Sequence, residues 1–206
     1  GNFMVVLDFM RRKVREPEKV LVAGSSAGGY GATANAPWIQ RSYPDAKLSV
    51  LADASQGVTT PGFDLGNPGQ GRQSWNMQLA PWVFGKDPSR ISGPDLLRVA
   101  AKGLPRAKVG QFTTAYDEVQ IGFYGVMKAY YGPGGSCSNL AVDWHNQAVS
   151  KVQADAAALS NFHYYVADGQ YHTNLRSPQF YAESSAGTRY RDWVQAMLRP
   201  RGDEPS

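Results

Sequence analysis

The chain has 206 residues, of which 42% are hydrophobic, 12% aromatic and 18% charged, and its formal net charge is +4. This length is enough for one domain with a sizeable core and too short for two ordinary domains, and the composition excludes a disordered polypeptide. The apolar runs fall far short of the ~18 residues that a membrane-spanning helix needs, so no transmembrane segment is predicted. We therefore expect residues 1–206 to form a single globular domain.

Short runs of β-branched residues alternate with helical patterns along the chain, which is typical of a mostly parallel sheet flanked by helices. Strands are expected at four places: Lys19–Ala23, Lys47–Ala52, Lys108–Thr113 and Asn161–Val166. Helices are expected over Phe3–Arg15, from the Gly24–Gly29 turn to about Arg41, and over Asp95–Lys102, Phe123–Tyr131, Val142–Leu159 and Thr188–Leu198. Pro37 lies inside the second of these helices and is expected to kink or split it.

The pattern weakens between residues 55 and 93, where Gly, Pro, Gln and Asn are frequent. We expect this segment to be an excursion of loops and short helices above the sheet. Large aromatic residues occur in it and just after the first strand: Trp75, Trp82, Phe84, Tyr30 and Trp38. They are interpreted either as the lining of an apolar or sugar-binding cleft, with Tyr30, Trp75 and Trp82 as substrate contacts, or as packing between the loops and the sheet.

The segment Gly24-Ser25-Ser26-Ala27-Gly28 fits the pattern G-x-S-x-G and stands directly after a buried strand and before a helix. In that context the pattern predicts a strained turn that exposes the Ser26 hydroxyl as a nucleophile. A Cβ at either terminal glycine is expected to collide with the adjoining strand or helix. The Ala27 N–H, which lacks a partner within the helix, is the expected oxyanion donor. A phosphate-binding turn is the alternative, although the usual phosphate-binding glycine patterns are absent.

A serine nucleophile needs a general base, and the chain has three histidines. His172 stands in a polar loop after the last expected strand, where an α/β-hydrolase sheet delivers its base. His163 lies inside that strand, and His145 lies at the start of a long expected helix. The position of His172 therefore makes it the predicted base.

The base in turn needs an acid that orients it. Asp117 follows the third expected strand and gives the chain order Ser…Asp…His of this class of enzymes. Asp53, directly after the second strand, and Asp168, beside a glycine in a turn, are the competing candidates. The predicted triad is Ser26, Asp117 and His172.

Four segments resemble the pectin acetylesterase family and its Notum-like relatives, which are α/β-hydrolase serine esterases. Gly24–Ala32, around the nucleophile, and Ala115–Gln120, which fits Ala-Tyr-Asp-x-x-Gln, are the specific ones. Leu51–Ser55 and Gly169–Thr173 resemble the family more weakly, and Ser55 replaces a family glycine. The resemblance implies an α/β-hydrolase fold, the same three triad residues and a secreted or periplasmic location. The sequence itself indicates no compartment.

The chain departs from this family in two respects. In an α/β-hydrolase, several strands and a loop with the second oxyanion donor precede the nucleophile, whereas here the first expected strand leads directly to Ser26. We expect either the C-terminal portion of a larger polypeptide, a second chain that completes the sheet, or a minimal variant, and favour the first. Cys137 is the one cysteine, so no intrachain disulfide is possible, and a cysteine-poor bacterial branch is the better comparison.

These observations predict a serine carboxylic-ester hydrolase that works through an acyl-enzyme and needs neither a metal nor a cofactor. The resemblance suggests acetyl esters on a polysaccharide, while the aromatic residues suit an apolar acyl ester or a polyester equally well. A non-catalytic binding module of the same fold, and an amidase or peptidase with the same triad, are the alternatives. Basic residues near both ends alternate with acidic ones and are interpreted as solvated helix faces, so nucleic-acid binding is not predicted.

Overall fold

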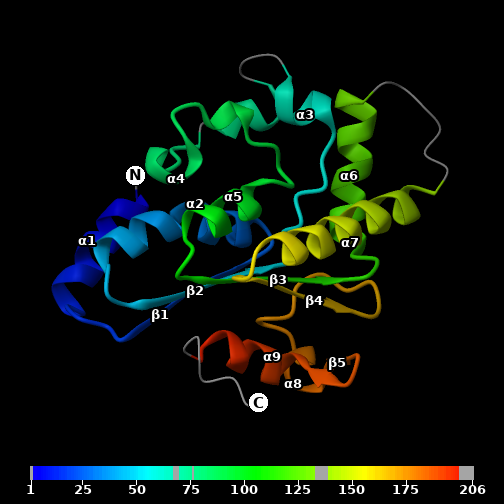
Figure 1. The fold of residues 1–206 in the computed structure, drawn as a ribbon. Coiled ribbons are helices and arrows are strands. Elements are labelled where there is room, and N and C mark those ends of the chain that lie inside the picture. The colour runs from blue at the N-terminus through cyan, green and yellow to red at the C-terminus, as the bar shows by residue number, and fades with distance from the viewer. Residues whose placement is uncertain (1, 67–69, 76, 133–138, 200–206) are drawn as a thin grey trace.

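The computed structural model describes residues 2–66, 70–75, 77–132 and 139–199 (Figure 1). Its centre is a parallel sheet in the order β1-β2-β3-β4, formed by Lys19–Ser25, Lys47–Asp53, Lys108–Thr114 and Phe162–Ala167. These strands coincide with the expected ones, apart from one or two residues at their ends. Ser25 is in register with Asp53, and Asp53 with Phe112, so the carboxyl ends of neighbouring strands meet at one edge. The predicted α/β fold with a parallel sheet is confirmed.

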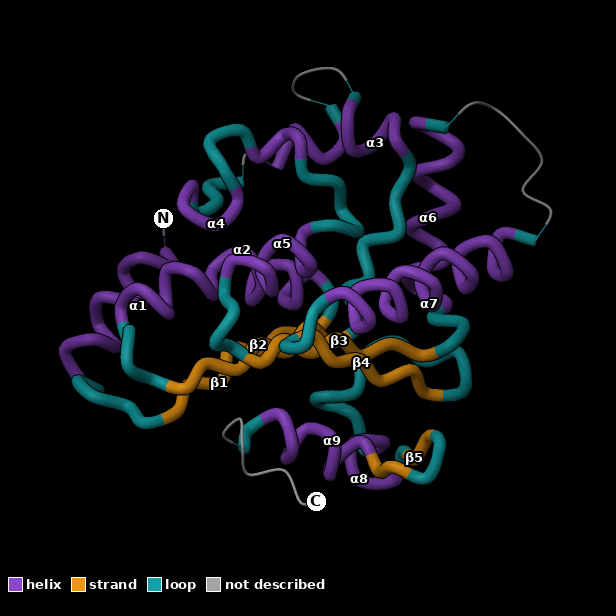
Figure 2. Tube along the Cα trace, in the orientation of Figure 1, coloured by secondary structure: helices purple, strands orange, loops and turns teal. Residues whose placement is uncertain are grey.

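Helices cover both faces of the sheet (Figures 1 and 2). One side carries α1 (Asn2–Lys13), α2 (Ala27–Ser42), α5 (Leu96–Gly103) and α7 (Leu140–Ala158), with α6 (Glu118–Tyr131) beyond them. The other side carries α8 (Gln179–Ala182), α9 (Tyr190–Met197) and a small antiparallel pair, β5 (Ser184–Ser185) and β6 (Thr188–Arg189).

Two helices differ from the expectation. α6 begins at Glu118, not at Phe123, because the Asp117 side chain caps it by accepting hydrogen bonds from the N–H groups of Val119 and Gln120. α2 runs without interruption from Ala27 to Ser42, so Pro37 does not split it. Pro37 is buried, and packing against the rest of the domain outweighs the backbone hydrogen bond that a proline removes.

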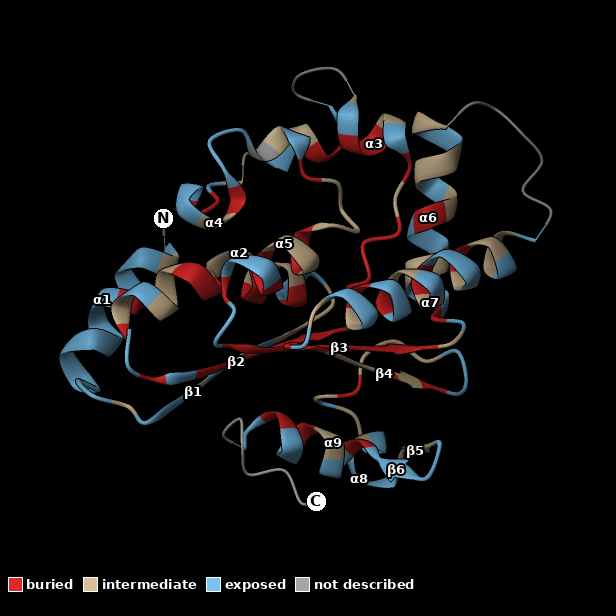
Figure 3. Cartoon of the chain, in the orientation of Figure 1, coloured by how far each residue is buried: buried red, intermediate tan, exposed pale blue. Residues whose placement is uncertain are grey.

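The core forms two layers because successive residues of a strand point to opposite faces of the sheet. Val50 and Val109 pack on the side of α2 and α7, whereas Leu51 and Phe112 pack on the side of α9. Covered on both faces, β2 and β3 are buried along almost their whole length, while β1 is exposed or half-buried (Figure 3). The carboxyl ends of the inner strands are therefore rigidly placed.

The segment between residues 55 and 93 forms the expected excursion above the sheet (Figure 1). It contains four short helices: α3 (Pro61–Leu65), η1 (Gly71–Trp75), α4 (Pro81–Phe84) and η2 (Pro88–Arg90). A buried ion pair joins α3 to η1, with Arg72 Nε 2.9 Å from Asp64 Oδ1. The same carboxylate oxygen accepts a hydrogen bond from the Gly93 N–H at 3.0 Å, which ties the end of the excursion to its beginning.

Apolar side chains remain exposed at the β1 edge of the molecule. Val5 is 70% exposed and Leu21 is 42% exposed. The exposed apolar residues of α1 and β1 are Met4, Val5, Val6, Phe9, Met10 and Leu21. Within the described ranges β1 pairs with β2 alone. None of the described helices combines the length and the hydropathy that crossing a membrane requires.

Candidate active site

Ser26 lies in the turn between β1 and α2 and has φ 55° and ψ −126°. A positive φ is strained for a residue with a Cβ, and hydrogen bonds on both sides hold this conformation. The Ser26 N–H donates to the Asp53 carbonyl at 2.7 Å. The Ser26 carbonyl accepts from the Gly29 N–H at 2.9 Å and from Ser55 Oγ at 2.6 Å. The predicted strained turn is therefore present and is fixed by its neighbours.

The expected collision is confirmed at the first glycine of this turn and contradicted at the last. A Cβ on Gly24 would lie 2.0 Å from the carbonyl oxygen of Gly28, so this glycine allows strand and helix to approach closely. A Cβ on Gly28 itself would meet no atom within 4 Å, which contradicts the expected collision there. The second crowded position is Gly29, where a Cβ would lie 1.9 Å from Ser55 Oγ. The sequence pattern missed it because Ser55 comes from a distant loop.

Asp117 follows β3 and is completely buried. Its carboxylate accepts hydrogen bonds from the backbone N–H groups of Val119 and Gln120 at 3.1 and 3.0 Å. The Gln120 side chain adds a third bond, with Nε2 2.9 Å from Asp117 Oδ2. These donors fix the carboxylate at the N-terminus of α6, where the helix dipole also favours a negative charge.

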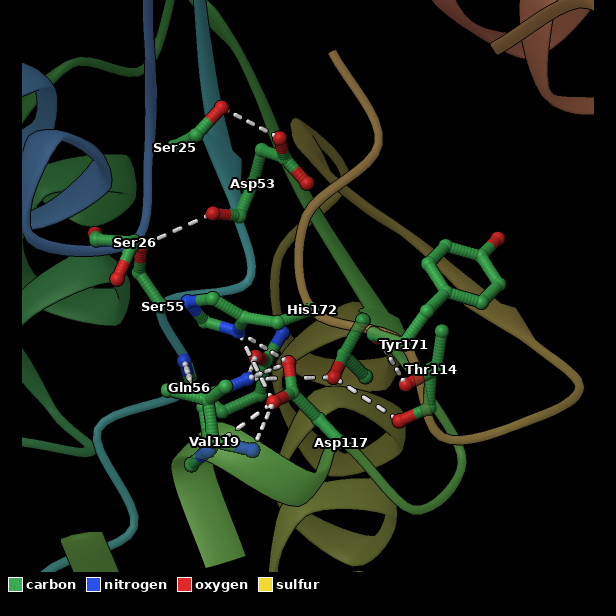
Figure 4. Close-up of polar contacts among 12 residues, drawn as sticks. Ser25, Ser26, Asp53, Ser55, Gln56, Thr114, Asp117, Val119, Tyr171 and His172 are labelled. Carbon is green, nitrogen blue, oxygen red and sulfur yellow. Dashed lines mark hydrogen bonds and ion pairs between the residues drawn. The ribbon is translucent and has the colours of Figure 1, made fainter. Parts of the chain in front are cut away.

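His172 belongs to the loop after β4, and its imidazole lies between Ser26 and Asp117 (Figure 4). Nδ1 is 2.9 and 2.8 Å from the two carboxylate oxygens of Asp117. Because a carboxylate only accepts hydrogen bonds, Nδ1 carries the proton and Nε2 of the neutral ring has a free lone pair. Nε2 is buried without a hydrogen-bond partner in the described part of the chain. His172 and Ser26 line the same cavity.

The competing histidines and acids make other contacts. His145 Nδ1 is 2.6 Å from the Ala115 carbonyl, and its ring stacks on Tyr116. His163 is paired within the sheet, opposite Gly110 on β3. Asp168 is exposed. Asp53 is fully buried beside the nucleophile turn, but its carboxylate bonds to Ser25 and to the backbone after His172, not to the imidazole.

The sequence analysis did not assign a role to Gln120 or Gln56. Gln120 Nε2 donates to Asp117 and to Gln56 Oε1, at 2.9 and 2.7 Å. The Gln56 N–H donates in return to Gln120 Oε1 at 2.9 Å. Asp117-x-x-Gln120 has the spacing of a helix capping box, which is the signal that identifies Gln120. Gln56 carries no comparable signal, because its partner is remote in sequence.

A cavity of ≈890 Å³ opens onto Ser26, Ala27 and His172. Its lining is mostly apolar and comes from α1, α2, α6, α7 and the excursion; its large side chains include Phe3, Phe63, Trp75, Met77, Leu79, Phe123, Met127 and Trp144. Tyr30 also lines it, and burial raises the pKa of Tyr30 to about 12. The phenol therefore stays protonated at neutral pH.

Two of the three aromatic residues named as substrate contacts, Tyr30 and Trp75, line this cavity. Trp82 lies outside it: its ring packs edge-on against Trp38, with centroids 4.6 Å apart, and the Arg41 guanidinium lies over it at 4.6 Å. Trp82 follows Pro81 at the start of α4, which directs it toward the far end of α2. It fits the alternative interpretation, in which an aromatic residue packs the excursion onto the domain.

Ala27 is the first residue of α2, so its N–H has no acceptor inside the helix. It lines the cavity next to Ser26. The described part of the chain contains no group of three His, Cys, Asp or Glu side chains that could hold a metal ion.

No protein-family model matches the chain, and no curated protein matches its sequence. Solved structures do match: the Wnt deacylase Notum from Drosophila in one crystal form has a TM-score of 0.60 and 14% identity over 93% of this chain. A second crystal form has a TM-score of 0.53 and 16% identity over 91% of it. The chain spans 56% and 58% of the length of these two structures. The resemblance inferred from the sequence is thus confirmed for the fold: this chain shares the α/β fold of the Notum structures, a parallel sheet flanked by helices, over slightly more than half of their length.

Proposed function

We propose that this chain is a serine carboxylic-ester hydrolase with Ser26 as nucleophile, His172 as general base and Asp117 as orienting acid. The observation that carries the proposal is the alignment of His172, whose Nδ1 is fixed by a buried carboxylate while Nε2 is free beside the strained Ser26 turn. A neutral imidazole held in this way can accept the proton of a serine hydroxyl through Nε2. The deacylase named in the matching structures is consistent with this activity.

The proposed reaction uses these groups as follows. Ser26 Oγ attacks the ester carbonyl carbon while His172 Nε2 takes its proton, and Asp117 stabilises the resulting imidazolium. The tetrahedral oxyanion accepts a hydrogen bond from the Ala27 N–H; one such donor is typically worth about 3 kcal/mol. His172 then returns the proton to the leaving alcohol. Water, activated by the same nitrogen, hydrolyses the acyl-enzyme and restores Ser26.

The cavity favours an apolar acyl group over acetyl as the part of the substrate that binds here. Its volume of ≈890 Å³ far exceeds what an acetyl group fills, and its lining is dominated by aromatic and aliphatic side chains. Burying an acyl chain stabilises the complex by about 0.8 kcal/mol for each CH₂ group. Tyr30 supplies a polar contact in this lining.

The exposed edge of β1 supports a further part of the proposal. An open edge with exposed apolar side chains on β1 and α1 suits pairing with additional strands. We assign these strands to an upstream segment of the same polypeptide, which also brings the second oxyanion donor to Ser26. A second chain in that place is the other outcome, and the mass of the native polypeptide distinguishes the two.

The test replaces the nucleophile by Ser26→Ala, with Ser150→Ala, an exposed serine of α7, as matched control. We expect Ser26→Ala to abolish both hydrolysis of p-nitrophenyl esters and labelling by a fluorophosphonate, with thermal unfolding nearly unchanged. Ser150→Ala should leave ester hydrolysis, labelling and thermal unfolding unchanged. Turnover that persists in Ser26→Ala contradicts the assignment. Absence of labelling in the unmutated protein favours a non-catalytic binding module, and faster cleavage of amides than of esters favours an amidase.

A further inference from the structure

Asp53 ends β2 at the sheet edge where the triad assembles, and it is fully buried. It lies between the nucleophile strand and β3, in register with Ser25 on one side and Phe112 on the other. A carboxylate buried at such a place requires several hydrogen-bond donors or a cation, because an unpaired charge is very costly away from water.

Donors from the end of β1 and from the loop after His172 satisfy this carboxylate (Figure 4 shows the first). Ser25 Oγ lies 2.6 Å from Oδ2. The Asn174 N–H donates to Oδ1 and Oδ2 at 2.9 and 3.0 Å, and the Leu175 N–H donates to Oδ2 at 3.0 Å. None of the ion pairs within the described ranges includes Asp53. Backbone amides two and three residues after His172 therefore take the place of a cation.

The backbone of Asp53 holds the nucleophile as well. Its carbonyl accepts the Ser26 N–H at 2.7 Å, which fixes the residue whose φ is 55°. Thr173, directly after His172, also has a positive φ, of 67°. A β-branched residue is strained in that region, so the turn needs an external constraint. The bonds from Asn174 and Leu175 to Asp53 supply that constraint.

We propose that Asp53 is a positioning residue: through Ser25 and Ser26 on one side and the Asn174 and Leu175 amides on the other, it keeps the His172 loop aligned with the nucleophile turn. The role rests on the proposed esterase function, and Asp53 touches neither substrate nor imidazole. It is distinct from that of Asp117, which bonds to His172 directly. A single carboxylate thus couples two loops that lie nearly 150 residues apart in sequence.

The test compares Asp53→Asn and Ser25→Ala with Asp155→Asn in the polypeptide as the cell makes it. Asp155 is a buried carboxylate paired with Lys151 on α7, away from the cavity, and serves as the matched control. In Asp53→Asn an amide N–H replaces one acceptor and opposes the backbone donors. We expect fluorophosphonate labelling of Ser26 to slow on the order of 100-fold, as displacements of about 1 Å do. Ser25→Ala removes one donor and should slow labelling about tenfold.

A second readout is the proton NMR signal of His172 Nδ1–H, which reports the imidazole position without any turnover. It should shift or broaden in Asp53→Asn and Ser25→Ala, and stay unchanged in Asp155→Asn, which should only lower the melting temperature. Labelling and NMR signals like those of the unmutated protein in both site variants would overturn the proposal. If Asp53→Asn does not fold, the labelling rate and the His172 NMR signal of Ser25→Ala alone decide whether the proposal stands. Failure of the unmutated protein to label contradicts the esterase function alone, since the NMR comparison still tests the positioning role.

Discussion

Close contacts of single atoms determine which glycines of the nucleophile turn are indispensable. Gly24 accommodates the Gly28 carbonyl oxygen, and Gly29 accommodates Ser55 Oγ, which bonds to Ser26. The neighbour of Gly24 is backbone and cannot move without separating β1 from α2, whereas the Ser55 side chain can rotate away. The two positions therefore differ in how much a methyl group disturbs them.

We expect Gly24→Ala to destabilise the protein by about 2–3 kcal/mol, the upper range for overpacking, and to abolish activity. Gly28→Ala is the matched control, because its Cβ meets nothing within 4 Å and alanine favours a helix over glycine by about 0.5–1 kcal/mol. Denaturant unfolding measures both changes. Equal losses of stability in the two variants would contradict the assigned contact.

At this scale the sequence predicted residues whose role depends on local pattern, and missed those whose role depends on remote partners. Ser26 and Ala27 follow from one pentapeptide between a strand and a helix. His172 and Asp117 follow from their positions after strands, and the structure brings them into contact. The bonds of Asp53, by contrast, reach residues more than 100 positions away, which no local pattern encodes.

The helix α2 has one face toward the sheet and another toward the cavity. Tyr30, Gly31, Ala34 and Trp38 follow each other at helical spacing along the cavity wall. Gly31 is the smallest of them, and a Cβ built on it meets no atom within 4 Å. A larger side chain at this position can therefore enter the cavity without distorting the helix.

We expect Gly31→Leu to lower kcat/KM for long-chain acyl esters by tenfold or more, on the order of what one or two methylene contacts are worth, and to leave acetyl esters unaffected. Steady-state kinetics on an acyl-length series measures this. Gly122→Leu, at an exposed position of α6 with open space around it, is the control. It should change kcat/KM neither for long-chain esters nor for acetyl esters. A uniform loss across all chain lengths would contradict the assignment of the cavity to the acyl group.

Among the elements, the four strands and the long α7 were predictable because buried runs and helical periodicity are strong local signals. The start of α6 was not, since Gly122 and Gly125 weaken its helical pattern and the cap at Asp117 sets the boundary. Thr188 joins a short strand instead of the last helix because it pairs with Ser185. Pairing and capping depend on tertiary neighbours, which override intrinsic propensity.

At the scale of the whole molecule, the sheet is asymmetric. The inner strands are covered on both faces, while β1 offers a free edge next to the exposed apolar residues of α1. The matched portion of the Notum structures is likewise little more than half of their length. The apolar surface that accompanies this edge was visible only once the helices were placed.

Hydrogen exchange of residues 19–25 in the native polypeptide tests whether additional strands pair with β1. We expect the amides of this segment to exchange nearly as slowly as those of Lys108–Thr114 in β3, because pairing on both sides removes the open edge. Exchange of its outward-facing amides within seconds would contradict the proposed strands. The amides that already bond to β2 serve as the internal control.

The order of the strands also bears on how heat or pressure affects catalysis. The proposed nucleophile Ser26 follows β1 and the proposed base His172 follows β4, so the strands that carry them are separated by three interstrand spacings, roughly 14 Å. Their alignment thus depends on the twist accumulated across every strand between them. A small relaxation of that twist would separate His172 from Ser26 while the hydrophobic core stays folded, so we expect the proposed activity to be lost before any probe of unfolding responds.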